Sequence, residues 1–321
     1  MKLKTLAASL AIAVSLMSGA AASDYPNRPI SIVVAYAAGG SNDVVARLIG
    51  PKISDFLGKP VIIENVSGAG GEVGATRVAR SAPDGYTLFL AAGGHAIAHG
   101  LKKSLQYDLV KDFSPISQVV QSPYMLLTNP SLPVKSVAEL IAYAKKHPGK
   151  LNYSSSGTGN PPHLCAEVFQ KMTGTELVQV PYRGEQPAIA GLVAGDVQMS
   201  FQGPGSTKGF IDSGTIRALA VTSKSRLKIL PDVPTLHESG LADFDISTWF
   251  ALIAPKNVDS DIVKKLHQAV LFALKEPTVL QRLAELGMVP VGNSPDELGA
   301  LLKTEVARYE GIIRAAGIER Q

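Results

Sequence analysis

The sequence predicts an α/β fold with two domains. Short apolar segments typical of strands alternate with amphipathic segments typical of helices, a pattern that favours mostly parallel sheets. Once a predicted export signal is removed, about 300 residues remain, which suits two domains. Two loops of similar composition lie far apart in the chain. The first loop, 37–42, follows a predicted strand that ends at residue 36, and the second loop, 154–162, follows a predicted strand at 151–153; each leads into a predicted helix.

The predicted elements alternate along the whole chain. Strands are expected at 30–36, 61–64, 87–91, 124–128, 178–180, 197–201 and 218–221. Helices are expected at 43–57, 72–81, 136–147, 163–173, 186–194, 260–275, 277–286 and 295–316. Ser136 and Ser294 are expected to cap helix starts, and Gly149 and Gly174 to end helices. The segment 222–247 is expected to be a long irregular connection.

The middle third of the chain is predicted to be an inserted domain. Apolar, strand-like segments at 119–128 and 246–253 flank it, and they are the two places where the chain would cross between domains. The expected first domain therefore combines 23–123 with 248–321, and the second spans 124–247. Two crossings of this kind predict a hinge with a cleft between the domains.

The N-terminus has the features of an export signal. Lys2 and Lys4 precede an apolar run at 6–17 that is too short to span a bilayer, and small residues at 20–22 suit cleavage. A membrane anchor is the alternative interpretation. We expect residues 1–22 to be removed and the mature protein to be periplasmic. The formal charge of +4 includes both lysines, so the remaining excess is too small to indicate nucleic acid. The single cysteine, Cys165, is expected to be a buried small hydrophobe.

The two similar loops predict an anion site. Each places small and glycine residues before a helix, where unpaired backbone N–H groups and the helix dipole attract phosphate or carboxylate. If they face each other, the loops can hold a small acid from two sides. Asp43 is expected to cap the first of these helices. Alternatively, it holds the loop N–H groups or accepts a donor from the ligand.

Several other motifs have two interpretations. Gly68–Gly74 fails the dinucleotide spacing, because Val73 stands where a glycine is required, so a tight strand-to-helix turn is expected. His95 and His99 have the spacing of metal ligands on a helix, but no acidic residue lies between them. His95 at a strand end is expected to line the cleft instead.

Three further side chains are candidates for the cleft. His163 either donates to an anion or caps its helix. Arg183 either clamps a carboxylate or forms a surface ion pair. Trp249, the only tryptophan, packs in the core or lines the hinge. No nucleophile elbow and no complete Ser–Lys motif occurs, so the sequence predicts no enzyme, no metal and no cofactor.

The chain resembles the Bug family of periplasmic solute-binding proteins, the receptors of tripartite tricarboxylate transporters. The motifs that carry the resemblance run in order through the mature chain: 25–30, the first loop, 64–65, 68–71, 82–88, 111–113, the second loop with 163–164, 181–184, 217–222, 230–235 and 249–255.

The resemblance implies a type II periplasmic-binding fold whose two domains close on an organic acid, with one carboxylate held by backbone amides and waters of the two loops. It implies transporter membrane subunits as partners. We also expect a monomer that binds no nucleic acid. A ligand sensor and, more remotely, an α/β hydrolase are the alternatives. The family often has proline where this chain has Ala35 and Ala38, which predicts a less rigid first loop. Gln202 is expected to face the far end of the ligand.

The residues expected to contact the ligand lie in the two loops, in the helix starts beside them and at strand ends. They are Tyr36, Ala37, Gly39, Gly40, Ser41, Asn42, Asp43, Gly94, His95, Ser155, Ser156, Gly157, Thr158, Gly159, Asn160, His163, Arg183 and Gln202.

Overall fold

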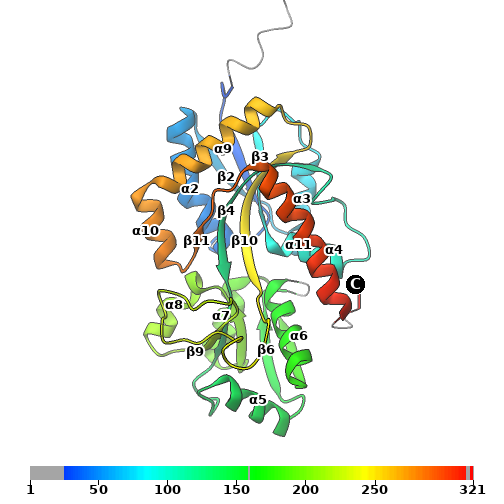
Figure 1. The fold of residues 1–321 in the computed structure, drawn as a ribbon, viewed down its shortest axis with the longest axis vertical. Coiled ribbons are helices and arrows are strands. Elements are labelled where there is room, and N and C mark those ends of the chain that lie inside the picture. The colour runs from blue at the N-terminus through cyan, green and yellow to red at the C-terminus, as the bar shows by residue number, and fades with distance from the viewer. Residues whose placement is uncertain (1–24, 158–159, 316–318, 321) are drawn as a thin grey trace, which may run out of the picture.

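The protein has two α/β domains, stacked along the long axis of the molecule (Figure 1). The computed structural model describes residues 25–157, 160–315 and 319–320, so the predicted export signal lies outside the described residues. None of the described helices is both long and apolar enough to cross a membrane.

The first domain is built on a six-stranded sheet in the order β11-β4-β10-β3-β1-β2. Its strands are β1 (Ile30–Val34), β2 (Val61–Asn65), β3 (Thr87–Ala92), β4 (Phe113–Pro123), β10 (Ser247–Pro255) and β11 (Val289–Pro290). Its helices are α2 (Ser41–Leu57), the 3-10 turn η1 (Ala69–Gly71), α3 (Glu72–Ala79), α4 (Gly93–Leu101), α9 (Ser260–Lys275), α10 (Pro277–Glu285) and α11 (Pro295–Ala315).

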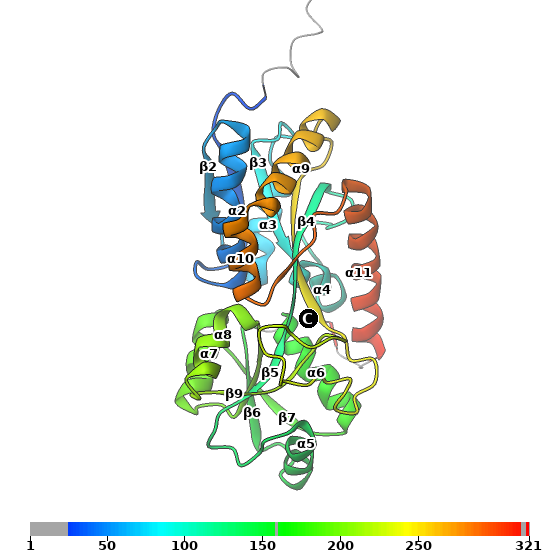
Figure 2. The ribbon, with the colours of Figure 1, turned by 60° about the vertical axis from the view of Figure 1, so that its left-hand side comes forward.

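Helices cover both faces of this sheet (Figures 1 and 2). Alternate residues of β1 enter different cores: Ile32 and Val34 pack with α2, α9 and α10, whereas Val33 packs with α3, α4 and α11. This alternation follows from the two-residue period of a strand. Trp249 on β10 is buried in the second of these cores, as the core interpretation predicts, and its indole N–H donates to Glu305 at 3.1 Å.

The second domain is built on a five-stranded sheet in the order β7-β6-β8-β5-β9. Its strands are β5 (Met125–Thr128), β6 (Leu151–Ser155), β7 (Leu177–Pro181), β8 (Met199–Gln202) and β9 (Arg217–Val221). Its helices are α5 (Val137–Lys146), α6 (Pro161–Thr173), α7 (Glu185–Ala194) and α8 (Pro204–Asp212). Cys165 is fully buried in its core, as expected.

The expectation of mostly parallel sheets was wrong. In the first sheet β1 pairs in parallel with β2 and β3, but β10 pairs antiparallel with β3 and β4. In the second sheet β6 is parallel to β7 and β8, whereas β5 is antiparallel to β8 and β9. The antiparallel strands β4, β5 and β10 adjoin the points where the chain passes between the domains.

The two crossings lie side by side and are joined by Thr222. Its hydroxyl accepts the Tyr124 N–H at 2.8 Å and donates to the carbonyl of Ile246. Its backbone carbonyl accepts the Ile246 N–H at 3.2 Å. Thr222 is fully buried. It therefore links the outgoing and the returning strand at the neck of the molecule. The stretch between Thr222 and Ile246 forms no helix or ladder strand, as predicted.

Candidate functional site

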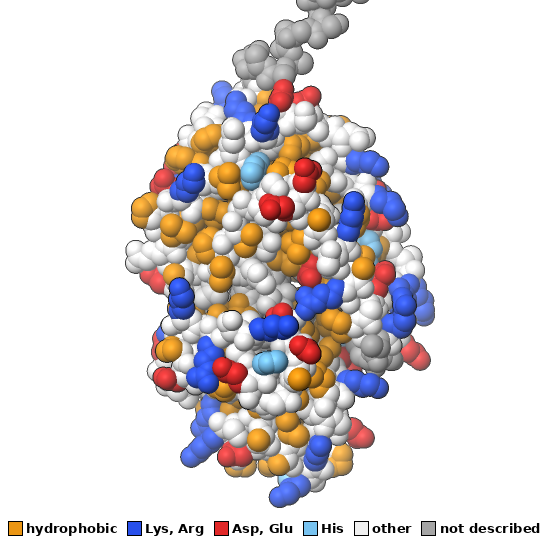
Figure 3. All heavy atoms as spheres, in the orientation of Figure 1, with side chains coloured by type: hydrophobic (Ala, Val, Ile, Leu, Met, Phe, Trp, Pro, Cys, Tyr) orange, Lys and Arg blue, Asp and Glu red, His pale blue; other side chains and the backbone are white. Residues whose placement is uncertain are grey.

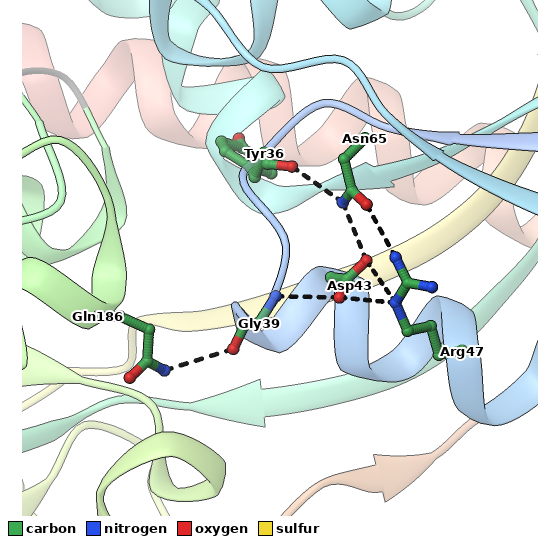
Figure 4. A network of polar contacts seen from close by, with 6 residues as sticks. All are labelled: Tyr36, Gly39, Asp43, Arg47, Asn65 and Gln186. Atoms are coloured by element: carbon green, nitrogen blue, oxygen red, sulfur yellow. Dashed lines mark hydrogen bonds and ion pairs between the residues drawn. The ribbon is translucent and has the colours of Figure 1, made fainter.

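The first loop connects β1 to α2 and is held by a polar network. Helix α2 begins at Ser41, two residues earlier than predicted, and its N-cap is Gly40. The expectation that Asp43 caps the helix was wrong, because Asp43 lies inside the first turn. Asp43 instead holds a loop N–H group, which was one of its alternative roles: its carboxylate accepts the Gly39 N–H at 3.0 Å (Figure 4). Gly39 has φ +85°, a conformation that favours glycine.

Asn65 and Arg47 complete this network (Figure 4). The Asn65 amide donates to the carbonyl of Tyr36 at 3.1 Å and to Asp43 at 2.9 Å. Arg47 donates from Nε to both carboxylate oxygens of Asp43, at 3.0 and 2.9 Å, and from Nη2 to the Asn65 carbonyl at 2.9 Å. The loop is therefore fixed at both ends, from the end of β2 and from the first turns of α2.

The charge of Asp43 is stabilised inside this network. Burial opposes ionisation of the carboxyl group, but the hydrogen bonds from Arg47, Gly39 and Asn65 outweigh it and lower the pKa of Asp43. Asp43 is almost fully buried, and its neighbour Asn42 is buried too, with its amide donating to the Leu90 carbonyl at 3.1 Å. The loop residues 37–39 remain exposed.

The start of α4 lies directly behind the first loop. His95 is fully buried, and its ring packs against Tyr36, Phe89 and Tyr107. Its Nδ1 lies 3.0 Å from the backbone N–H and the carbonyl oxygen of Ala92. Burial lowers the pKa of His95 to about 4, so the ring is neutral at pH 7. His95 therefore supports Tyr36 from behind and does not face solvent in this structure.

The second loop connects β6 to α6. Asn160 is the N-cap of α6, and its side-chain oxygen accepts the His163 N–H at 3.1 Å. The Ser155 hydroxyl donates to the Gly157 carbonyl at 3.1 Å, and Gln179 donates to Ser155 at 2.8 Å. Ser156 and Gly157 are half-buried. Thr158 and Gly159 were also predicted to bind the ligand, but they lie outside the described residues.

His163 and Gln202 lie at the base of the second loop. The His163 side chain is nearly buried, and its Nε2 lies 3.6 Å from a carboxylate oxygen of Glu167. Gln202 at the end of β8 is buried, and its amide donates to the Ser200 hydroxyl at 3.0 Å. Ser200 in turn bonds Ser154 on the neighbouring strand β6, at 2.8 Å between the hydroxyls. Gln202 therefore continues a buried polar row that runs to the second loop.

Arg183 follows Tyr182, whose backbone N–H donates to the Ser155 carbonyl at 2.9 Å. The Arg183 side chain is exposed on the turn before α7, and no ion pair joins it to a carboxylate among the described residues. A surface ion pair, one of its two predicted roles, is therefore not observed. Contact with a ligand stays a prediction.

The two domains touch beside the first loop. A Cβ atom built on Gly94, at the start of α4, would lie 2.8 Å from the Tyr36 hydroxyl and 3.5 Å from Pro161 at the start of α6. The helix starts that follow β3 and β6 are therefore in contact across the domain interface. Three buried polar atoms of predicted site residues have no hydrogen-bond partner within the described chain: Asn42 Oδ1, His95 Nε2 and Asn160 Nδ2. Such atoms are rare in folded proteins, and the described residues have three more, on Thr76, Thr128 and His267, which were not predicted to contact the ligand.

The sequence interpretation missed two residues that contact the first loop from the other domain. Gln186 donates to the Gly39 carbonyl at 3.3 Å (Figure 4). Glu185 accepts the Ser41 N–H at 3.1 Å. In the sequence, Glu185 is an ordinary acidic residue in the first turn of a helix, where it favours the dipole, so nothing local indicates a contact with residue 41.

The site offers backbone N–H groups at two helix starts, serine hydroxyls and side-chain amides, with the neutral His95 ring packed against Tyr36. Within the described part of the chain, no group of three His, Cys, Asp or Glu side chains is arranged to hold a metal ion. His99, the second member of the predicted pair, accepts the Leu109 N–H through Nε2 at 3.1 Å.

Comparison with known sequences gives a family. The chain matches the family described as "Tripartite tricarboxylate transporter family receptor" over residues 45–318. BugT of Bordetella pertussis is 38% identical to it over 298 residues, which make up 92% of this chain and 91% of BugT.

Solved structures agree with this match. The periplasmic binding protein BugD superposes with a TM-score of 0.88 at 35% identity, covering 92% of this chain and all of that one. Rpa4515 of R. palustris with adipate gives 0.89 at 35% identity, over 93% of this chain and 100% of its own. MatC from Rhodopseudomonas palustris with bound malate superposes with a TM-score of 0.85 at 34% identity, covering 90% of this chain and 100% of MatC. These likenesses confirm the predicted two-domain fold of periplasmic binding proteins, and the chain belongs to the tripartite tricarboxylate transporter receptor family, as its resemblance to the Bug proteins indicated.

Proposed function

We propose that this protein is a periplasmic receptor that binds a small organic carboxylate between its domains and delivers it to a tripartite tricarboxylate-type membrane transporter. The observation that carries the proposal is the meeting of two loop-to-helix starts from different domains, at Gly94 and Pro161, beside the first loop. Two relatives of similar length and fold hold adipate and malate.

The ligand carboxylate is held by the N–H groups of the first loop and by the Ser155–Asn160 loop. The helix dipoles of α2 and α6 favour a negative charge at these places. Residues 37, 38 and 40 are exposed or half-buried and supply backbone N–H donors, whereas the Gly39 N–H is already bound to Asp43. Ser41 and Ser155 supply hydroxyls. Gln202 contacts the distal part of the ligand and selects among acids. The receptor works as a monomer and catalyses no reaction.

The hinge lies at the neck joined by Thr222. On this basis we place the domain boundaries at 123/124 and 247/248, with 23–123 and 248–321 in one domain. A residue that binds both crossing strands allows the domains to rotate as rigid units about a short segment. Closure then brings the two loops together around the ligand.

A thermal-shift screen of the mature protein tests the proposal. Malate, adipate, aspartate, glutamate, nicotinate and benzoate are added singly, with matched amines and sugars as controls. A ligand at 100 times its Kd stabilises the folded state by about 2.7 kcal/mol, which gives a measurable rise in Tm. Native mass spectrometry then measures stoichiometry. If no carboxylate raises Tm, or if an ester or amide is turned over steadily, the proposal is wrong.

The delivery step needs its own test. Cells that contain the receptor and the membrane subunits are compared with cells that lack only the receptor, using the labelled acid found in the screen. Uptake that depends on the receptor supports delivery. Binding without any effect on uptake would favour the sensor alternative.

A further inference from the structure

The Glu185 side chain reaches from the second domain to the N-terminus of α2 in the first. One of its carboxylate oxygens accepts the Ser41 N–H at 3.1 Å, and the Ser41 hydroxyl lies 3.1 and 3.2 Å from the two oxygens. The Ser206 hydroxyl, at the start of α8, also donates to it. The carboxylate therefore lies among three helix starts, those of α2, α8 and its own α7.

The charge of Glu185 is compensated by dipoles and hydrogen bonds. In the described part of the chain no lysine, arginine or histidine forms an ion pair with it. Its donors are a backbone N–H and two serine hydroxyls. These are the donors that a small carboxylate would use at the same place, because an N–H at a helix start favours a negative charge.

Glu185 and a ligand carboxylate need the same atoms. A Cβ atom built on Gly40 would lie 3.4 Å from the Glu185 carboxylate, so the side chain covers the first loop at Gly40 as well as at Ser41. The adjacent Gln186 contacts the same loop through the Gly39 carbonyl (Figure 4). The first turn of α7 is thus docked on the first loop by one charged and one neutral side chain.

We propose that Glu185 is an internal carboxylate that occupies the α2 N-terminus, holds the two domains together, and must be displaced by the ligand acid. Glu185 then sets the affinity for carboxylates, because each acid competes with a covalently tethered one. This inference rests on the proposed function, since it assumes that the ligand carboxylate binds at the first loop.

Binding measurements with Glu185→Gln and Glu185→Ala test the competition. The probes are malate and adipate, titrated by calorimetry into the wild type and each variant. A hydrogen bond to a charged group exceeds a neutral one by about 1.4 kcal/mol, so Glu185→Gln should bind the probe about tenfold more tightly. Ser206→Ala, which removes one donor and no charge, should give a smaller gain. Glu176→Gln makes the same charge change at an exposed position of the second domain and should leave affinity unchanged.

Small-angle scattering of the ligand-free proteins tests the contact without any ligand. Glu185→Ala should increase the radius of gyration relative to the wild type, and Glu176→Gln should not. Circular dichroism confirms that each variant is folded. Equal or weaker probe binding by both Glu185 variants overturns the proposal, as does unchanged scattering of Glu185→Ala. If neither probe binds even the wild type, the proposed carboxylate function loses its support, and the scattering result still decides whether Glu185 holds the domains together.

Discussion

The carboxylate of Asp43 accepts the backbone N–H of Gly39, four residues earlier in the chain, at 3.0 Å. This bond turns the end of the first loop back towards α2. Arg47 and Asn65 hold the same carboxylate in place, so the conformation of the exposed loop depends on a buried charge. The network of Asp43, Arg47 and Asn65 therefore fixes the positions of the exposed loop N–H groups.

Replacing Asp43 by alanine should weaken the binding of every carboxylate to a similar degree. The loss removes a charge-assisted hydrogen bond, worth about 1.5–3 kcal/mol, from the element that orients the loop. Calorimetry with several acids measures the effect. Asp212→Ala is the matched control, because Asp212 also pairs with a cation one helical turn away, Lys208, but on the exposed face of α8. A loss confined to one acid would show that Asp43 contacts the ligand and does not only shape the loop.

Replacing Gln202 by alanine should reorder the preference among acids. Gln202 is buried at the end of β8 and belongs to the polar row behind the second loop. We expect it to contact only the distal part of a ligand. The ratio of Kd values for a short and a long dicarboxylate, malate and adipate, measures the change. Gln281→Ala, on the exposed face of α10, is the control. Identical ratios in both variants and the wild type would remove Gln202 from the site.

Stability should depend on pH through His95. Its folded pKa of about 4 lies below the usual value of 6.5, so on acidification the unfolded chain takes up a proton first. The contribution of the neutral His95 ring to the free energy of unfolding is complete above about pH 6.5. It falls by roughly 3 kcal/mol in all as the pH drops towards 4.

Urea unfolding of the wild type and His95→Gln at pH 7 and pH 4.5 isolates this effect. The difference in unfolding free energy between the two proteins should change by about 2 kcal/mol over this interval, because carboxylates that titrate in both proteins cancel. His147→Gln at an exposed position serves as the matched control. A difference that stays constant with pH would show that His95 is not buried as a neutral ring.

Replacing Gly74 by alanine should destabilise the first domain. A Cβ atom at this position of α3 would lie 2.8 Å from the Ala35 side chain and from the Val66 carbonyl, so backbone must shift, at a cost of about 1–3 kcal/mol. Gly209→Ala in α8 meets nothing within 4 Å and should be neutral or slightly stabilising, because alanine favours a helix. Thermal unfolding of both variants measures the contrast. An unchanged Tm for Gly74→Ala would mean that the turn after β2 is not closely packed.

Much of the fold could be predicted because its signals are local. The predicted helices and strands recur within a few residues of their observed bounds, and Ser136 caps α5 as expected, by accepting the Glu139 N–H at 3.2 Å. Helices α4 and α8 were missed. Two glycines begin α4, and α8 follows the sequence Gly203-Pro204-Gly205, so both starts look like loops. Burial of α4 against neighbouring elements overrides this weak local preference. In α8, Pro204 stands in the first turn, a position that proline favours in helices.

The candidate site was less predictable, because its contacts join residues far apart in sequence. The loops themselves could be found from their glycines and the helices that follow. The contact of Glu185 with Ser41 spans 144 residues and exists only when the domains meet. His95 was expected as a possible lining residue, but its neighbours Tyr36, Phe89 and Tyr107 come from three other segments and bury it.

The position of β10 in the first sheet has a consequence for biosynthesis. This strand lies between β3 and β4 and pairs with both, although it follows β4 by more than a hundred residues. Until residues 247–255 have been synthesised and exported, β4 has no neighbouring strand that connects it to β3. All strands of the second sheet lie within 125–221, a continuous stretch with shorter loops to close. During synthesis and export from the N-terminal end, the domain that starts later in the chain can therefore complete its sheet first.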